Sequence, residues 1–225
     1  IDESICMAQL FVDTSSLVSD IYSIKTESQF DQTLQDVIRD RGAHTKLISD
    51  YAQVEISNKV KAIIQHLHIQ DWQSEAHHQH QNPCERRYND IKRTANRLLD
   101  RSGCSPNLWL LALQYTCHLL NHTTCPFLNN NIPLTVLTGN TVDISMLLKF
   151  HWYERVYFCD ETAPFPSSSP EHTGNFVDFN DHVGHQLTFA IICDDTNKII
   201  SRSEGSSIEY PFSINCCEDN WEDQD

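Results

Sequence analysis

Three acidic residues stand where strands end and a helix begins. Asp13 ends an early apolar run, Asp50 ends a later one, and Glu85 opens a helical pattern. In an open α/β sheet such positions converge on one edge, where these folds place their sites. Carboxylates are preferred ligands of Mg²⁺, and two bound ions can activate a hydroxyl and stabilise a leaving oxygen in phosphodiester chemistry. The placement of Asp13, Asp50 and Glu85 would suit a divalent-metal site, but acids at the ends of elements more often cap them and face solvent, so placement alone favours that alternative.

The second chemical feature is the stretch NPCERRYNDIKRTANRLLDR, residues 82–101, which has the spacing of a helix with two faces. Its apolar face carries Tyr88, Ile91, Ala95, Leu98 and Leu99, and its opposite face carries Arg86, Arg93, Arg97 and Arg101. A row of arginines can neutralise successive phosphates of a nucleic acid without reading its sequence. The alternative is an ordinary solvated helix face.

Alternating strand and helix patterns surround these residues and predict a mixed α/β fold. We expect strands at 7–13, 18–25, 45–50 and 68–74, and helices at 27–41, 55–67, 82–101 and 105–122. Gly42 should end the first of these helices, and Ser105 with Pro106 should start the last. Trp72, Trp109 and Trp152 are expected in the core.

The sequence pattern changes near residue 150. From there on, short segments rich in strand-forming residues alternate with turn residues, among them DDTN at 194–197. We expect a core at 1–125, a helical connecting segment at 126–149, a small β-barrel-like domain at 150–204 and an acidic, disordered tail at 205–225. The chain has a formal net charge of −15, but residues 1–158 hold 17 acidic and 14 basic side chains, so the acidity lies mainly in the C-terminal third.

Composition narrows the class of protein further. With 40% hydrophobic residues and no apolar run of about 18, the sequence predicts a globular protein without a membrane span. Nine scattered cysteines with no C-x-x-C pair indicate reduced thiols and an intracellular location, in the nucleus or cytoplasm. Histidines at 77, 78 and 80 near Cys84 lack the paired spacing of a structural zinc site.

Several segments together resemble the ribonuclease-H-like integrase core of copia-type retrotransposons. They are FVDTSSLVSDIYSIKTESQF, KLISD, HQHQNPCERR, WLLALQYTCHLLNHT, IPLTVLTGNTVDISMLLKF and KIISRS, which occur in the family's order over residues 8–203. The 34 residues between Asp50 and Glu85 compare with 35 in the family signature. Two departures stand out: Tyr51-Ala52 replaces Asn-Gly, and Asn82-Pro83-Cys84 is one residue shorter than the family's loop.

The resemblance implies a ribonuclease-H-like mixed sheet with flanking helices, followed by the small barrel-like domain. It implies an integrase that uses Mg²⁺ or Mn²⁺, held by Asp13, Asp50 and Glu85, for DNA 3′-end processing and strand transfer. The helix that begins at the glutamate would contact DNA, with Lys92 two turns beyond Glu85 and the DNA-binding set being Arg86, Lys92, Arg93, Arg97 and Arg101. Element ends and target DNA would be its partners, and the active form a homo-oligomer.

Two rival interpretations stay open from the sequence. One is a catalytically decayed remnant that acts only as a nucleic-acid- or protein-binding module, which loss of metal binding would reveal. The other is a ribonuclease-H-like nuclease of the same fold, which would cleave RNA–DNA hybrids.

Overall fold

The computed structural model describes residues 7–49, 57–73, 83–159, 171–180, 183 and 188–208. Asp50, the histidines at 77, 78 and 80, and the chain after residue 208 lie outside these ranges. In chain order the first half contains β1 (Met7–Val12), β2 (Ser19–Ile24), the 3-10 turn η1 (Glu27–Gln29), α1 (Phe30–Arg41), β3 (Lys46–Ser49), α2 (Asn58–His66), β4 (Gln70–Gln73), α3 (Pro83–Ser102) and α4 (Trp109–His122). These bounds confirm the predicted order of strands and helices.

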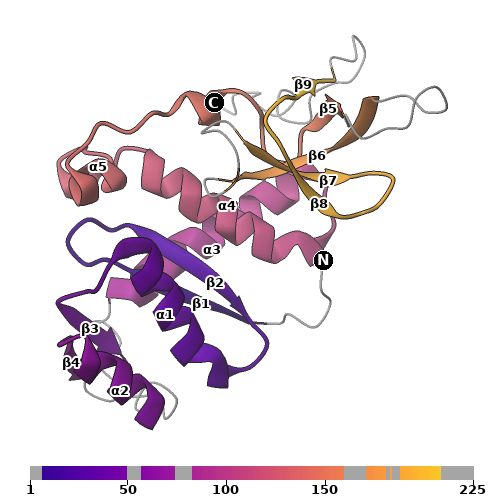
Figure 1. Ribbon diagram of the computed structural model, residues 1–225. Helices are drawn as coiled ribbons and strands as arrows, with labels where there is room; N and C mark the ends of the chain where they lie inside the picture. Colours follow the sequence, from indigo (N-terminus) through magenta and orange to yellow (C-terminus); the bar gives the residue numbers. More distant parts are fainter. Residues whose placement is uncertain are drawn as a thin grey trace, which may run out of the picture.

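Two small sheets form the strand layer of this half (Figure 1). β1 and β2 pair as an antiparallel hairpin, with Met7 opposite Ile24 and Val12 opposite Ser19. β3 and β4 pair in parallel, as expected for strands joined through the crossover helix α2. In the described residues the mixed sheet is thus present as two separate pairs of strands.

Helix α1 connects the two pairs through one apolar cluster. Phe30, Leu34 and Val37 lie four and three residues apart and are buried, which places them on one face of the helix. Phe30 and Leu34 pack with Leu47 of β3, and Phe11 of β1 packs against the same cluster. The helix ends at Gly42, whose φ of 87° suits glycine.

The helices α3 and α4 pack against each other and bring the hairpin and the C-terminal region together. Pro83 opens α3, where its missing N–H costs nothing. Ser105 accepts a hydrogen bond from the Asn107 N–H and starts a short 3-10 helix, η3 (Pro106–Leu108), that leads into α4. The sequence pattern predicts η3 and α4 as a single helix over 105–122, whereas the structure divides this segment into a 3-10 helix and an α-helix.

After α4 the chain passes through η4 (Pro126–Leu128), α5 (Pro133–Thr138) and η5 (Ser145–Leu148). It then forms an antiparallel sheet of β5 (Arg155–Cys159), β6 (Glu171–Phe179), β7 (Phe189–Cys193), β8 (Ile199–Arg202) and β9 (Ser206–Ser207), in the order β8-β7-β6-β5-β9. The predicted DDTN turn joins β7 to β8, with Asn197 at φ 54°. The β-rich C-terminal region is therefore confirmed as a five-stranded sheet.

One apolar cluster runs from the β1–β2 hairpin through α3 and α4 into the C-terminal sheet. Trp152 is buried, and its indole N–H donates to the Val177 carbonyl at 3.0 Å. Trp109 is partly buried against the same cluster. The prediction for Trp72 is wrong: it is 40% exposed, because β4 is an outer strand, and it lies under the Lys46 ammonium.

Candidate nucleic-acid interface and metal site

Asp13 lies at the start of the turn that joins β1 to β2. Its Oδ2 atom accepts hydrogen bonds from the Ser15 hydroxyl at 2.7 Å, the Ser16 N–H at 2.7 Å and the Ser16 hydroxyl at 2.6 Å. The turn is closed by the Asp13 N–H, which donates to the Val18 carbonyl, and by Leu17 in the left-handed region at φ 61°. Such side-chain-to-backbone bonds are typical of aspartate in turns.

The electrostatics of Asp13 follow from these bonds. Partial burial raises the pKa of its carboxyl group, but the donors on Ser16 and Ser15 and the charge of His44 outweigh burial, so the pKa lies below its usual value. One carboxylate oxygen is fully used by the turn, and only Oδ1 is left for another ligand. The structure therefore gives Asp13 a structural role of its own.

Glu85 lies in the first turn of α3 and is exposed. The side chains on either side of it fix this end of the helix to the hairpin. The Cys84 thiol donates to the Leu10 carbonyl at 3.7 Å, and the Arg87 Nε donates to the Ser19 hydroxyl at 2.9 Å. Ser19 pairs with Val12, the residue before Asp13. The first turn of α3 thus lies against the end of the hairpin from which Asp13 projects.

Asp50 falls outside the described residues, directly after the end of β3 at Ser49. Within the described part of the chain no three His, Cys, Asp or Glu side chains are grouped to hold a metal ion. Of the three predicted ligands, Asp13 and Glu85 are described and Asp50 is not, so the metal site stays a prediction.

The basic face of α3 has the exposure that its spacing predicts. Ile91 and Ala95 are buried against the core, whereas the predicted cationic residues all face solvent: Arg86, Lys92, Arg93, Arg97 and Arg101. The four arginines fall within about 80° of arc at 100° per residue, and Lys92 falls near Glu85 on a neighbouring flank. The helix thus carries one row of arginines, which we call the arginine row (Arg86, Arg93, Arg97 and Arg101).

Within the described part of the chain, only Arg93 of these five cationic residues forms an ion pair with an acid. Arg93 contacts Asp90 at 2.8 Å, one turn back on the same helix, in an exposed pair. Among the described residues no acid forms an ion pair with Arg86, Lys92, Arg97 or Arg101. Free guanidinium groups in a row leave their donors available to an external anion.

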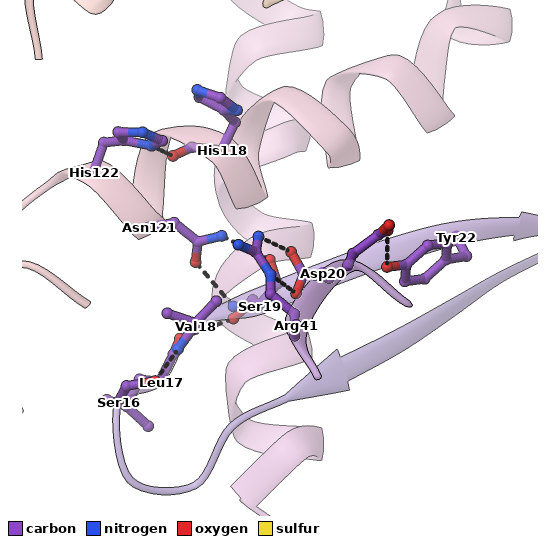
Figure 2. A network of polar contacts seen from close by, with 11 residues as sticks. Ser16, Leu17, Val18, Ser19, Asp20, Tyr22, Arg41, His118, Asn121 and His122 are labelled. Carbon is purple, nitrogen blue, oxygen red and sulfur yellow. Dashed lines mark hydrogen bonds and ion pairs between the residues drawn. The ribbon is translucent and has the colours of Figure 1, made fainter. Parts of the chain in front are cut away.

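A buried polar junction at Ser19 sets the position of α3, and sequence reasoning did not detect it. The Asn121 side chain of α4 accepts from the Ser19 N–H and donates to the Ser19 carbonyl, both at 2.9 Å (Figure 2). Arg87 of α3 reaches the hydroxyl of the same serine. Three elements therefore meet at one residue of β2. The signal in the sequence is that two polar residues occupy inward positions, since Ser19 shares the strand face of Ile21 and Asn121 lies one helical turn after Cys117.

Arg87 differs from the arginine row because it turns inward. One of its terminal nitrogens, Nη2, is buried without a hydrogen-bond partner in the described residues. Burial, followed by the charge of Asp20, raises the pKa of the neighbouring Cys117 thiol to about 12, and the charge of Arg87 opposes this rise. Arg87 is thus part of the helix–hairpin contact and is not part of the exposed basic face.

Asp20 and Tyr22 fasten β2 to the end of α1 on the outer side of the hairpin. Arg41 donates twice to the Asp20 carboxylate, at 2.7 and 2.8 Å, and the Tyr22 hydroxyl donates to Asp40 at 2.9 Å (Figure 2). Burial and the bond to Asp40 raise the pKa of Tyr22. These contacts join the hairpin to the C-terminal end of α1.

The chain is similar to known proteins in its structure and not in its sequence. No protein-family model matches the chain, and no curated protein matches it in sequence. Among solved structures the chain is similar to a chain of the simian T-cell lymphotropic virus intasome in complex with PP2A regulatory subunit B56 gamma. The TM-score is 0.51 at 14% identity, over 91% of this chain and 73% of that chain.

The chain is also similar to the HTLV-2 integrase catalytic core domain in complex with magnesium. The dimeric form gives a TM-score of 0.47 at 17% identity, over 59% of this chain and 84% of that chain. The trimeric form gives 0.47 at 17% identity, over 57% and 82%. The likeness to the intasome chain shows that this protein has a mixed α/β integrase-core-like fold followed by a five-stranded antiparallel sheet.

The helices of the described residues include none that is long and apolar enough to cross a membrane.

Proposed function

We propose that this protein binds duplex DNA through the arginine row of α3. The observation that carries the proposal is that Arg86, Arg97 and Arg101 are exposed and form no ion pair among the described residues, in a chain of net charge −15. An acidic protein that keeps a row of free guanidinium groups has a surface suited to phosphates.

The dimensions of the row suit a phosphate backbone. Arg86 and Arg101 are 15 residues apart, which is about 22 Å along a helix at 1.5 Å per residue. Phosphates along one DNA strand follow one another at about 3.4 Å along the axis, so the row spans roughly six of them. Contacts of this kind fix the protein on DNA without selecting a base sequence.

The salt dependence of binding tests the proposal directly. Each neutralised phosphate contributes about −0.9 to the slope of log affinity against log salt concentration. Arg97→Gln combined with Arg101→Gln should weaken binding of any duplex and flatten the slope by about two. Fluorescence anisotropy over a salt series gives both quantities.

A matched control removes the same charge elsewhere. Arg39 and Lys59 are 71% and 81% exposed on α1 and α2, and Arg39→Gln with Lys59→Gln should leave the slope unchanged. If the two double variants behave alike, or if the wild-type protein does not bind duplex DNA, the proposed function is wrong.

A second candidate function is metal-dependent DNA 3′-end processing and strand transfer. Support comes from the integrase-core-like fold and from the carboxylate donor set of Asp13, Asp50 and Glu85, which suits Mg²⁺ or Mn²⁺. Bound metal would activate the attacking water or 3′-hydroxyl and stabilise the leaving oxygen. Glu85 is exposed at the helix start and open to a ligand, while Asp13 would contribute through Oδ1 or give up its turn.

The two candidates respond differently to metal. For the catalytic candidate, calorimetric titration with Mg²⁺ should give binding that Asp50→Asn and Glu85→Gln abolish, with Asp100→Asn on the same helix as the control. DNA binding without a metal response would leave a noncatalytic module. Cleavage of RNA–DNA hybrids, with no joining of DNA ends, would instead identify a nuclease.

Origin from a copia-type retrotransposon is the finer part of the proposal and rests on the six sequence segments that resemble that family. It would make element ends and target DNA the partners, with the chain divided near residues 125, 149 and 204. The genomic sequence on both sides of the coding region tests this origin, because a reverse-transcriptase sequence downstream would support it and unrelated coding sequence would not.

A further inference from the structure

The parallel pair of strands β3 and β4 has two faces of different character. Side chains alternate along a strand, so Leu47 and Ser49 of β3 point to one face, and Lys46 and Ile48 point to the other. Leu47 and Ser49 are buried, and Leu47 packs into the apolar cluster that α1 and α2 form. The two helices therefore cover the face of the pair to which Leu47 belongs.

The opposite face, which we call the open face (Lys46, Ile48, Gln70 and Trp72), is in contact with solvent. The strand register places Lys46 beside Gln70 and Ile48 beside Trp72. Lys46, Gln70 and Trp72 are exposed and Ile48 is half-buried. Figure 1 shows the pair at the outer end of the molecule, away from the C-terminal sheet. Strands that pair in parallel are normally covered on both faces, so an open face on such a pair is a candidate binding surface.

Trp72 is the most unusual member of the open face. It keeps 40% of its surface exposed although the Lys46 ammonium lies 4.6 Å from the centroid of its ring. This cation–π contact favours one orientation of the ring. A side chain that is already oriented loses less conformational freedom when a ligand binds to it. The strand pair thus presents a large aromatic ring to solvent in a geometry suited to stacking.

The charge of the open face indicates the class of ligand. Of its four residues only Lys46 is charged, and the nearest acid along β4, Asp71, points to the opposite face because side chains alternate. This face is therefore positive in a chain of net charge −15. An aromatic ring, a cation and an amide such as that of Gln70 are the groups with which proteins stack an unpaired base, meet its phosphate and bond its edge.

We propose that the open face binds an unpaired base of a single-stranded nucleic acid, stacked on Trp72 with a neighbouring phosphate beside Lys46. A base inside a duplex is already stacked on both sides and is not available to the ring. An apolar protein surface could also cover Trp72, but it would bury the Lys46 ammonium without an anion, which is costly. The open face does not include the arginine row, so this proposal goes beyond duplex binding and does not depend on it.

Binding of short single strands tests the stacking on Trp72. Labelled strands of eight thymidines and of eight uridines are titrated with the full chain, and anisotropy and tryptophan emission are recorded together. Binding should quench the emission, and a comparison of the two strands assigns the ligand to DNA or RNA. Trp72→Leu should abolish the quenching and weaken binding at least about fivefold, whereas Trp72→Phe should retain most of the affinity.

Matched controls separate stacking from general attraction between charges. Phe127→Leu alters another exposed aromatic side chain, 80% exposed on η4, and should leave binding unchanged. An abasic strand with the same number of phosphates should bind the wild-type protein at least about fivefold more weakly than the thymidine strand. Lys46→Gln should flatten the slope of log affinity against log salt concentration by about 0.7, and Lys61→Gln, at an exposed position of α2, should not.

The outcomes decide the proposal independently of the arginine row. Trp72→Leu should leave duplex binding unchanged, while Arg97→Gln combined with Arg101→Gln should weaken it, so either proposal can fail alone. The proposal is wrong if neither single strand binds, or if the abasic strand binds as tightly as the thymidine strand. It is also wrong if Trp72→Leu, folded by circular dichroism, binds the thymidine strand like the wild type. A protein partner would then be the occupant to test.

Discussion

The two longest helices in the described part of the chain, α3 and α4, lie against each other and differ sharply in charge and burial. Residues 83–102 of α3 include nine charged side chains, and residues 109–122 of α4 include none. α3 has one buried face and one solvated face, whereas α4 is packed by α3, by β2 and by β6. In a helix with many charged residues, the sequence indicates which face is exposed. In a helix without charged residues, only the packing of neighbouring elements determines which side is buried.

The largest effect on stability should come from removing a buried aromatic side chain of α4. The Tyr115 ring is buried, with its centroid 5.9 Å from that of Phe176 and 6.0 Å from that of Phe179. Tyr115→Ala should lower the free energy of unfolding by about 3–5 kcal/mol. Tyr88→Ala on α3, where the ring is 39% exposed, should cost much less. Urea denaturation of both variants checks the contrast, and equal losses would mean that α4 is not the central helix.

The next largest effect should come from the junction at Ser19. Asn121→Ala leaves the Ser19 N–H and carbonyl without their buried partner, which should cost about 2–3 kcal/mol. Asn96→Ala, at an exposed position of α3, provides the comparison and should change stability by less than about 0.5 kcal/mol. A loss of similar size at both positions would mean that the two hydrogen bonds between Asn121 and Ser19 do not stabilise the fold.

A smaller effect is expected at Asp13, and it depends on pH. Its carboxyl pKa is lowered in the folded protein, so the ionised form stabilises the fold above the unfolded pKa of about 3.9. That stability should disappear as the pH falls through the lower folded pKa. Asp13→Asn should therefore cost about 1 kcal/mol at pH 7 and less near pH 3, where more of the carboxyl group is protonated. Guanidinium unfolding at both pH values measures this, and a difference independent of pH would refute it.

The smallest effect on stability should come from the arginine row itself. Arg97→Gln should leave the free energy of unfolding unchanged and flatten the DNA salt slope by about one. Arg93→Gln should change the slope less, because Asp90 already neutralises part of its charge. If Arg93→Gln has the larger effect on anisotropy titrations, the ion pair within α3 opens when DNA binds.

Much of the local structure could be predicted because its signals are local. Gly42 ends α1, the DDTN turn joins two strands, and the spacing of Ile91 and Ala95 identifies the buried face of α3. Each depends on residues within a turn or two of the chain. Such patterns carry their own physical reason, whether a left-handed φ or a repeat of 3.6 residues.

Other features depend on partners far away in sequence and could not be predicted. Ser19 and Asn121 are 102 positions apart, and neither residue alone indicates that the two form hydrogen bonds with each other. Arg87 lies four residues before the buried Ile91, so helical spacing places it beside the inner face of α3, but its partner Ser19 on β2 could not be identified from the sequence. Trp72 is a residue type common in protein cores but lies on an outer strand.

The two-stranded pairs β1–β2 and β3–β4 also determine how quickly backbone amides exchange their hydrogens with solvent. In the described residues each of these strands has one hydrogen-bonded neighbour, whereas β6 has β5 on one side and β7 on the other. Exchange from β6 requires the whole sheet to open, but exchange from β3 needs only the local loss of one partner. Deuterium labelling should therefore reach β3 long before β6. If it does, the strand that leads to Asp50 opens more readily than the central strand of the C-terminal sheet.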